Sequence, residues 1–548
     1  MSQDIINITE VYNAFNPFKP LQPGDNSYVN CSDVRGHENI LLEIGTKIKR
    51  SKIPTCQLYT GHRGVGKSTE LLRLKKNLET KGFFVVYFGA TEGDIDEQDA
   101  EYADILLACT RHILEQLKDY INDTNTKSLF DWLNCRLTDL QDLKLYEFKG
   151  LFNQLEVKEK IAFFAKLTNI LKRRPGTRDR IRKQVNLYSN ELIDSLNEFM
   201  SEAQKELSTT TKKMVVIADN LDRIIPVARS DERNTVDRSD ERNSNDEIFI
   251  DHGSELTSLD CHVIYTVPIS LVYSNRATEL NNIYKAPQVL PMIMVRDREN
   301  KVYQPGINKL KEIIEKRISS VAPDIDIDID KDIFYSKDTR LKLCTSTGGH
   351  VRELMLLMQT AMDWIDNFPI TEQAVNQAIN NVRDNTYRSA VDQDEWQKLA
   401  QVYLDKSIPN DEEYRSLLFR RCVLEYRYIN ELGNIVRWHD VHPLIEGTEE
   451  FQQAYADAYL KSPLYPTANN VDSTTLEILT EIQKIYEDYR EHNNHEKAAE
   501  TAEKAYEILQ DILESVNKQH APELYARITA LAAFWKLNRD IYHARSGV

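Results

Sequence analysis

The chain has 548 residues, more than one hydrophobic core usually organises, so we expect about three domains. A composition of 41% hydrophobic and 28% charged residues excludes a disordered chain, and a formal net charge of −17 argues against a protein coated in nucleic acid. The longest apolar stretch, Phe83–Gly89, is far shorter than the roughly 20 residues of a membrane helix. With no secretory signal and seven scattered cysteines, the sequence predicts a cytoplasmic protein with no membrane partner.

The first half of the chain alternates between short apolar runs and helical patterns. An irregular segment, residues 1–50, ends in an amphipathic helix, and buried strands are expected at Cys56–Tyr59 and Phe83–Phe88, each followed by a helix. Residues 123–210 have a helical pattern throughout and predict an insertion. Strands resume at Met214–Ala218 and His262–Tyr265, with a last one expected at Val289–Val295. Strands that alternate with helices are typical of a parallel α/β sheet.

A glycine-rich loop joins the first strand to its helix and has the complete Walker A spacing G-x-x-x-x-G-K-[ST]. Its glycines let backbone N–H groups cradle a phosphate, Lys67 reaches the β- and γ-phosphates, and the Ser68 hydroxyl is expected to bind Mg²⁺. The helix adds its positive N-terminal end. The predicted ATP-binding residues are Gly61, His62, Arg63, Gly64, Val65, Gly66, Lys67, Ser68 and Thr69.

A second strand supports the same site. The run Val215–Ala218 ends in Asp219, as a Walker B strand does, and this carboxylate is expected to hold Mg²⁺. Many hydrolysing relatives place an acid next, but this chain has Asn220. Asp222 is the nearest other carboxylate and the candidate base, so we expect slow hydrolysis and a nucleotide that acts as a switch.

Two later positions are candidates for contact with the γ-phosphate. Thr266 ends the strand that begins at His262, and Arg352 lies in the first turn of a helix that follows the pair Gly348-Gly349. A surface ion pair with Glu353 or a nearby acid is the alternative for Arg352, and a strand-end threonine is commonplace.

Taken in chain order, these residues resemble the AAA+-like and STAND signalling ATPases, and most closely the prokaryotic branch with KAP-type NTPases and origin-recognition initiators. The resemblance rests on Arg35-Gly36-x-Glu38, Gly61–Ser68, Asp219-Asn220-Leu221-Asp222-Arg223, Thr266 and Gly348-Gly349-x-x-Arg352. It implies an αβα sandwich with a helical lid, Thr266 as sensor 1 and Arg352 as sensor 2. It also implies self-association, with Arg223, Arg276 or Arg296 of a neighbour completing the site, and a place in an anti-phage conflict system.

The last third reads as mainly helical. Helices and two short apolar runs around Gly433 suggest a winged helix, and a helical domain with a β-ribbon is the alternative. We expect a lead-in and nucleotide-pocket segment at 1–50, the P-loop core at 51–300, a helical lid at 301–390, the winged helix at 391–447 and a helical region at 448–548. A basic cluster, Lys172–Lys183, is either a contact for nucleic acid or a neighbour, or a solvated helix face.

Two functions follow from this. The first is a regulatory switch ATPase that binds ATP and Mg²⁺, assembles with itself and activates a partner effector, since no effector motif is visible in this chain. The second is a DNA-loading or DNA-remodelling ATPase that uses the winged helix and the basic cluster. A GTPase is disfavoured because no N-K-x-D motif follows the strands, and a small-molecule kinase would lack a recognisable substrate site.

Overall fold

A computed structural model of the chain shows two compact units, Met1–Ala390 with Lys406–Leu444, and Val391–Asp405 with Ile445–Val548. The structure describes residues 7–37, 39–90, 93–120, 123–137, 156, 158–162, 164–165, 173–207, 213–226, 228–229, 242–323, 325–461, 484–486, 489, 494–515, 532, 535–536 and 538–539. Glu38 and Lys172, which the sequence singled out, lie outside these residues, as does much of the 123–210 insertion and of the 448–548 region.

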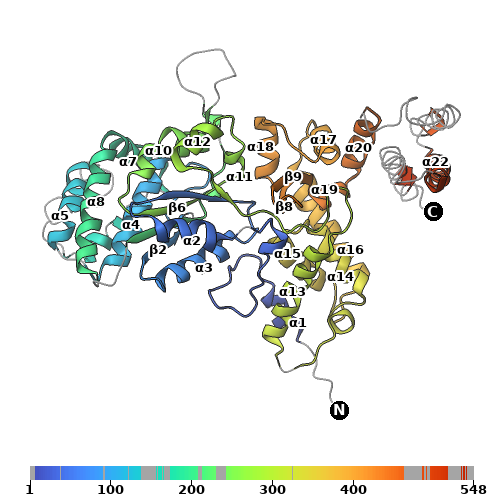
Figure 1. Ribbon diagram of the computed structural model, residues 1–548, viewed down its shortest axis with the longest axis horizontal. Coiled ribbons are helices and arrows are strands. Elements are labelled where there is room, and N and C mark those ends of the chain that lie inside the picture. Colours follow the sequence, from blue (N-terminus) through green and yellow to red (C-terminus); the bar gives the residue numbers. More distant parts are fainter. Residues whose placement is uncertain are drawn as a thin grey trace. The chain divides into compact units, whose positions relative to one another are not determined.

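A five-stranded parallel sheet is the centre of the first unit (Figure 1). Its order is β2-β3-β6-β1-β7, and the strands are β1 (Cys56–Thr60), β2 (Phe84–Gly89), β3 (Met214–Asp219), β6 (His262–Val267) and β7 (Gln288–Val289). β3 and β6 are buried along their whole length, as is typical of parallel strands in a sheet that is covered by helices on both faces. The predicted α/β sheet is confirmed, although its last strand is only two residues long.

Helices cover both faces of the sheet, and alternate strand residues point to opposite sides. On one face, Val215 and Ile217 pack with α2 (Ile40–Arg50) and α3 (Lys67–Glu79). On the other, Val216 and Ala218 pack with α4 (Tyr102–Leu117), α10 (Gly253–Thr257) and α12 (Ala277–Tyr284). These layers make the αβα sandwich that the sequence predicts.

The insertion between β2 and β3 is helical in its described residues. It contains α5 (Asp123–Leu137), α7 (Pro175–Leu187) and α8 (Ser189–Glu206), which lie beside α4 (Figure 1). Leu192, Leu196 and Phe199 are buried on the face of α8 that their helical spacing predicts.

Helices also form the part that follows the sheet. They are α13 (Gln304–Val321), α14 (Lys337–Ser346), α15 (Val351–Met362) and α16 (Glu372–Val382), and the N-terminal α1 (Ile8–Ala14) packs against α13 and α15. Short elements include η1 (Ser32–Val34), η6 (Leu221–Arg223), β4 (Ala228–Arg229), β5 (Arg242–Asn243), α9 (Ser244–Asp246), η8 (Glu247–Asp251), α11 (Ile269–Val272), η9 (Ile329–Ile333), η10 (Arg383–Tyr387), η11 (Arg388–Ala390) and α19 (Pro443–Glu446).

A β-hairpin closes the first unit. It consists of β8 (Val423–Ile429) and β9 (Ile435–Val441) and follows α18 (Glu412–Phe419). Buried side chains of both strands join the core beneath α2 and α3. Residues 290–294, where the sequence predicts more strand, instead donate backbone hydrogen bonds to three separate segments, at Thr60, Glu425 and Val34. This divided pairing is why the strand ends at Val289.

The second unit is helical in its described residues, with α17 (Trp396–Asp405), α20 (Glu449–Lys461) and α22 (His495–Ser515). Tyr403 of α17 makes edge contacts with Phe451 and Tyr455 of α20, at ring-centroid distances of 5.7 and 5.2 Å. The segment 391–447 is therefore divided between the two units, at α17 and at the hairpin. Among the helices described in either unit, none has the length and apolar character to cross a membrane.

Candidate nucleotide-binding site

The glycine-rich loop has the backbone that a phosphate cradle needs. Gly61, Gly64 and Gly66 have φ values of +146°, +94° and +113°, in the region that side chains disfavour. A Cβ on Gly64 would lie 2.7 Å from the His350 ring, so glycine is also required there by close packing. The loop leads directly into α3, whose N-terminal end faces the site.

Lys67 is buried and held by three oxygen atoms. Its Nζ lies 3.0 Å from Oδ2 of Asp222 and donates to the carbonyl oxygens of Gly61 and His62, at 2.7 and 3.0 Å. Asp222 is also buried, in the 3-10 turn η6 that follows β3. The predicted P-loop lysine and the predicted base are therefore an ion pair in this structure.

Asp219 lies at the carboxyl end of β3, next to the start of α3. Its carboxylate accepts hydrogen bonds from Tyr87 at 2.7 Å and from the Asn220 amide at 2.7 Å. Burial, followed by the negative charge of Asp222, raises the pKa of Asp219, and the nearby Ser68 hydroxyl opposes this rise. The two predicted Mg²⁺ ligands, Ser68 and Asp219, are thus near each other, and a divalent cation there would relieve the cost of the buried carboxylate.

Asn220 has a structural reason to follow Asp219. Its φ of +68° is left-handed, a conformation that asparagine tolerates better than most residues. The turn that it makes brings Asp222 back toward Lys67.

Thr266 is placed differently from the expected contact with the γ-phosphate. It is fully buried, and its hydroxyl accepts a hydrogen bond from the Leu221 amide at 3.0 Å. Thr266 therefore supports the turn that carries Asp222, and it does not line the cavity described below.

Helix α15 is bound to the P-loop at its N-terminus. His350 caps the helix by accepting the Glu353 amide at Nδ1 (3.1 Å), and its Nε2 donates to the Arg63 carbonyl oxygen at 2.7 Å. The Arg352 amide donates to the Gly64 carbonyl oxygen at 3.3 Å. Arg352 lines the cavity, as predicted, and burial, with the nearby charges of Arg421, Arg63 and Arg223, lowers its pKa to about 10.

Sequence reasoning missed that the hairpin and the N-terminal segment hold the loop from other directions. The buried Nε2 of His62 accepts the Glu425 amide of β8 at 2.9 Å, and burial lowers the pKa of His62 to about 3. Arg35 donates to the Val65 carbonyl oxygen at 2.9 Å, and Gly36 lies against Arg427 of β8, where a Cβ would approach to 3.0 Å. The resemblance of Arg35-Gly36 to a family motif was the sequence signal for the contacts that these two residues make, and no sequence signal pointed to the contact of His62 with Glu425.

One cavity of about 200 Å³ connects these parts. The phosphate end of the cavity is lined by the loop residues Arg63–Thr69 together with Tyr87, Asn220, Asp222, Arg223 and Arg352, whose amide donates to the loop. The cavity is also lined by Asn16–Leu21 and Ser27–Ser32 of the N-terminal segment, by Gln288–Leu290, and by Val351 and Met355. The cavity has the mixed polar and apolar lining that a nucleotide needs.

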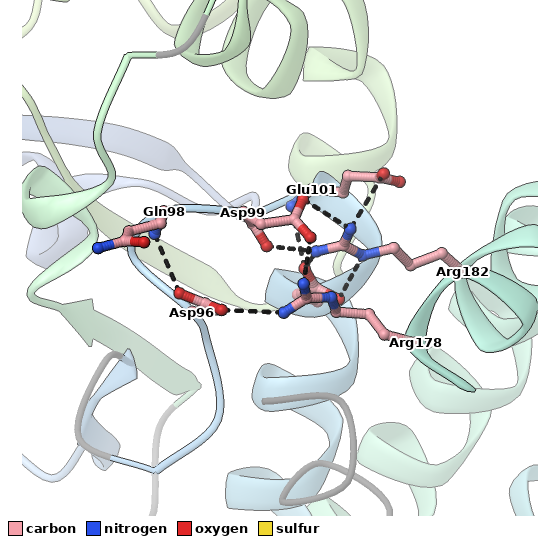
Figure 2. Close-up of polar contacts among 7 residues, drawn as sticks. Asp96, Gln98, Asp99, Glu101, Arg178 and Arg182 are labelled. Atoms are coloured by element: carbon pink, nitrogen blue, oxygen red, sulfur yellow. Dashed lines mark hydrogen bonds and ion pairs between the residues drawn. The ribbon is translucent and has the colours of Figure 1, made fainter. Parts of the chain in front are cut away.

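The remaining arginines considered for the site are engaged within the chain. Arg276 pairs with Asp251 and Glu279 at the surface, and the half-buried Arg296 pairs with the buried Asp440 at 2.8 Å. Arg223 lines the cavity of its own chain. In the basic cluster, Arg178 and Arg182 are buried against acids of residues 96–104, whereas Arg173, Arg174, Arg180 and Lys183 are exposed (Figure 2).

The fold and the site define a P-loop NTPase. Residues 40–227 match the family model described as the KAP family P-loop domain. No curated protein matches the chain. Among solved structures, the chain is similar to the ORC1 protein of Aeropyrum pernix, determined in complex with DNA, at 11% identity and a TM-score of 0.34 over 82% of this chain and 96% of that one.

Proposed function

We propose that this protein binds ATP with Mg²⁺ in the cavity at the P-loop and acts as a slow, regulatory ATPase. One observation carries the proposal: the P-loop, the turn after the Walker B strand and the lid helix α15 line the same cavity. The amides and carbonyls that join α15 to the P-loop make the position of the lid sensitive to what the loop binds.

The residues present fit a bound Mg²⁺–phosphate group. Ser68 and Asp219 offer the oxygen ligands that Mg²⁺ prefers, and a bound Mg²⁺ would neutralise phosphate charge. The backbone amides of the loop and Lys67 would hold the phosphates, and Thr69 lines the cavity beside them.

Slow turnover is supported by the surroundings of Asp222. Its carboxylate is paired with Lys67, and the position after Asp219, where an acid would be a second candidate base, is Asn220. Asp222 can accept a proton from water only after the phosphates have drawn Lys67 away. Binding and base activation are thereby coupled.

The output that we propose is assembly with further copies or with an effector protein. It is supported by the lid contacts and by the resemblance to STAND ATPases, which also suggests a defence role. The DNA-loading alternative has no specific support from the arginines near the hairpin: Arg421 pairs with Glu353, Arg427 with Glu425, and Arg437 lies over the Tyr273 ring.

The first prediction tests the site itself. Lys67→Ala removes a buried cation from the phosphate end, so the affinity for Mg-ATP should fall at least about 30-fold in isothermal titration. Lys75→Ala is a matched control, because Lys75 lies on the same helix but pairs with Glu79 at the surface. If Lys67→Ala binds ATP with undiminished affinity, ATP does not bind at the P-loop end of this cavity and the proposed site is wrong.

A further inference from the structure

The phosphate end of the cavity carries more positive charge than the P-loop alone supplies. Arg63, Arg223 and Arg352 all line it, and the charges of the first two act on the third. The acids that line the cavity are already matched with cations: Glu70 with Arg73 and Asp222 with Lys67. This excess of guanidinium groups suits a ligand with several negative charges.

Glu97 is the anion shared by two of these arginines. Its carboxylate oxygens lie 3.7 Å from Arg63 and 3.9 Å from Arg223. All three side chains are partly exposed, with relative exposures of 40%, 29% and 31% for Arg63, Arg223 and Glu97. Long, solvent-screened pairs of this kind are weak, whereas a phosphate can accept two short bonds from one guanidinium.

The two arginines lie close in the chain to groups that a P-loop uses for the outer phosphates. Arg223 directly follows Asp222, whose carboxylate holds Lys67, the residue that reaches the β- and γ-phosphates in a P-loop. Arg63 belongs to the loop itself, and its carbonyl oxygen is bound by His350 at the start of the lid. Both residues line the cavity beside the loop and turn that hold Lys67, so their guanidinium groups are candidates for contact with a third phosphate.

Glu97 belongs to a loop whose residues on either side of it are held by ion pairs. Its carbonyl oxygen accepts the Ile225 amide at 2.8 Å, just past the Walker B turn. On either side, Asp96 and Asp99 are paired with the buried Arg178 of α7 (Figure 2). Arg182, one turn later, binds Asp99, Glu101 and the buried Asp104 (Figure 2). We call Asp94–Asp104 the acidic loop.

We propose that Arg63 and Arg223 bind the γ-phosphate of ATP and that Glu97 is their counter-ion when the site is empty or holds ADP. When ATP binds, its γ-phosphate takes the place of Glu97 beside the two arginines. The acidic loop then shifts, and its ion pairs with Arg178 and Arg182 transmit this shift to the helical insertion. This inference rests on the proposed function and adds to it the residues that distinguish a triphosphate from a diphosphate.

The test compares the affinities for Mg-ATP and Mg-ADP by isothermal titration at one salt concentration. Arg63→Ala and Arg223→Ala should each weaken ATP binding by about tenfold or more and change ADP binding by less than about twofold. Arg63→Lys should recover part of the lost ATP affinity. Such recovery would show that Arg63→Ala acts by removing a positive charge and not by disturbing the structure of the loop. Glu97→Gln should tighten ATP binding by about two- to tenfold and leave ADP binding unchanged.

Glu115→Gln is the matched control. Glu115 has a similar exposure, 34%, and pairs with Arg111 and His112, which also hold Asp94 of the acidic loop, so the substitution disturbs an ion pair near the loop without touching Arg63 or Arg223, and the ATP-to-ADP affinity ratio should not change. Amide exchange gives a second readout: ATP, but not ADP, should speed exchange in residues 93–101 of the unsubstituted protein, and Glu97→Gln should show fast exchange with either nucleotide.

Equal effects of Arg63→Ala and Arg223→Ala on the two nucleotides would overturn the inference, and so would an unchanged ATP-to-ADP affinity ratio in Glu97→Gln. The proposed function fails differently, through ATP binding that is absent or insensitive to Lys67→Ala. If ATP binding depends on Lys67 but the arginine variants affect ATP and ADP equally, the proposed function stands and only this inference is wrong.

Discussion

At the scale of single residues, the P-loop lysine Lys67 is already paired with Asp222 before it binds a phosphate. Lys67 gives up an ion pair of 3.0 Å and two carbonyl contacts when it turns to the phosphates. Part of the binding free energy is therefore spent on separating Lys67 from Asp222. The same step releases the carboxylate that is best placed to accept a proton from water.

Asp222→Asn tests this double role. Because the amide removes the negative charge that competes for Lys67, ATP should bind a few-fold more tightly, whereas turnover should fall by about 100-fold or more if Asp222 is the base. Single-turnover phosphate release and ATP titration measure the two effects separately. Normal turnover in this variant would exclude Asp222 as the base.

At the scale of elements, the sequence predicts best what lies close together in the chain. The strand, loop and helix around Lys67, and the strand that ends in Asp219, follow from local spacing and apolar runs. The contacts of His62 with β8 and of Arg178 with the acidic loop join residues 363 and 82 positions apart, and periodicity carries no information about such pairs. For Thr266, the strand end predicts its position in the sheet but not which backbone group its hydroxyl binds.

The turn before α15 is an element whose packing can be tested. Gly349 and Gly433 share a φ of +78°, but a Cβ on Gly349 would lie 1.8 Å from the Ile293 carbonyl oxygen, whereas a Cβ on Gly433 would meet open space. We expect Gly349→Ala to lose about 3 kcal/mol or more of unfolding free energy and Gly433→Ala about 1 kcal/mol. Chemical denaturation measures both, and similar losses would contradict the close approach of the turn to residue 293.

At the scale of the whole molecule, the open question is whether nucleotide state changes the number of copies. Light scattering should give the monomer mass of 63.6 kDa without nucleotide and a multiple of it with Mg-ATP. Lys67→Ala should stay monomeric under both conditions. An ATP-bound protein that remains at the monomer mass would contradict self-assembly, and a mass increase that requires duplex DNA, with a steep salt dependence, would favour the DNA-loading alternative.

The contact between His62 and Glu425 also has a consequence for how the protein is made. At synthesis rates of 5–20 residues per second, the 363 residues between them emerge roughly 20 to 70 s after the P-loop does. The nascent chain thus presents a complete Walker A motif long before its lid and hairpin exist. Maturation of the nucleotide site therefore waits for synthesis of the hairpin, and ribosome-bound chains that stop before residue 350 should lack the contacts that His350 and Glu425 make with the loop.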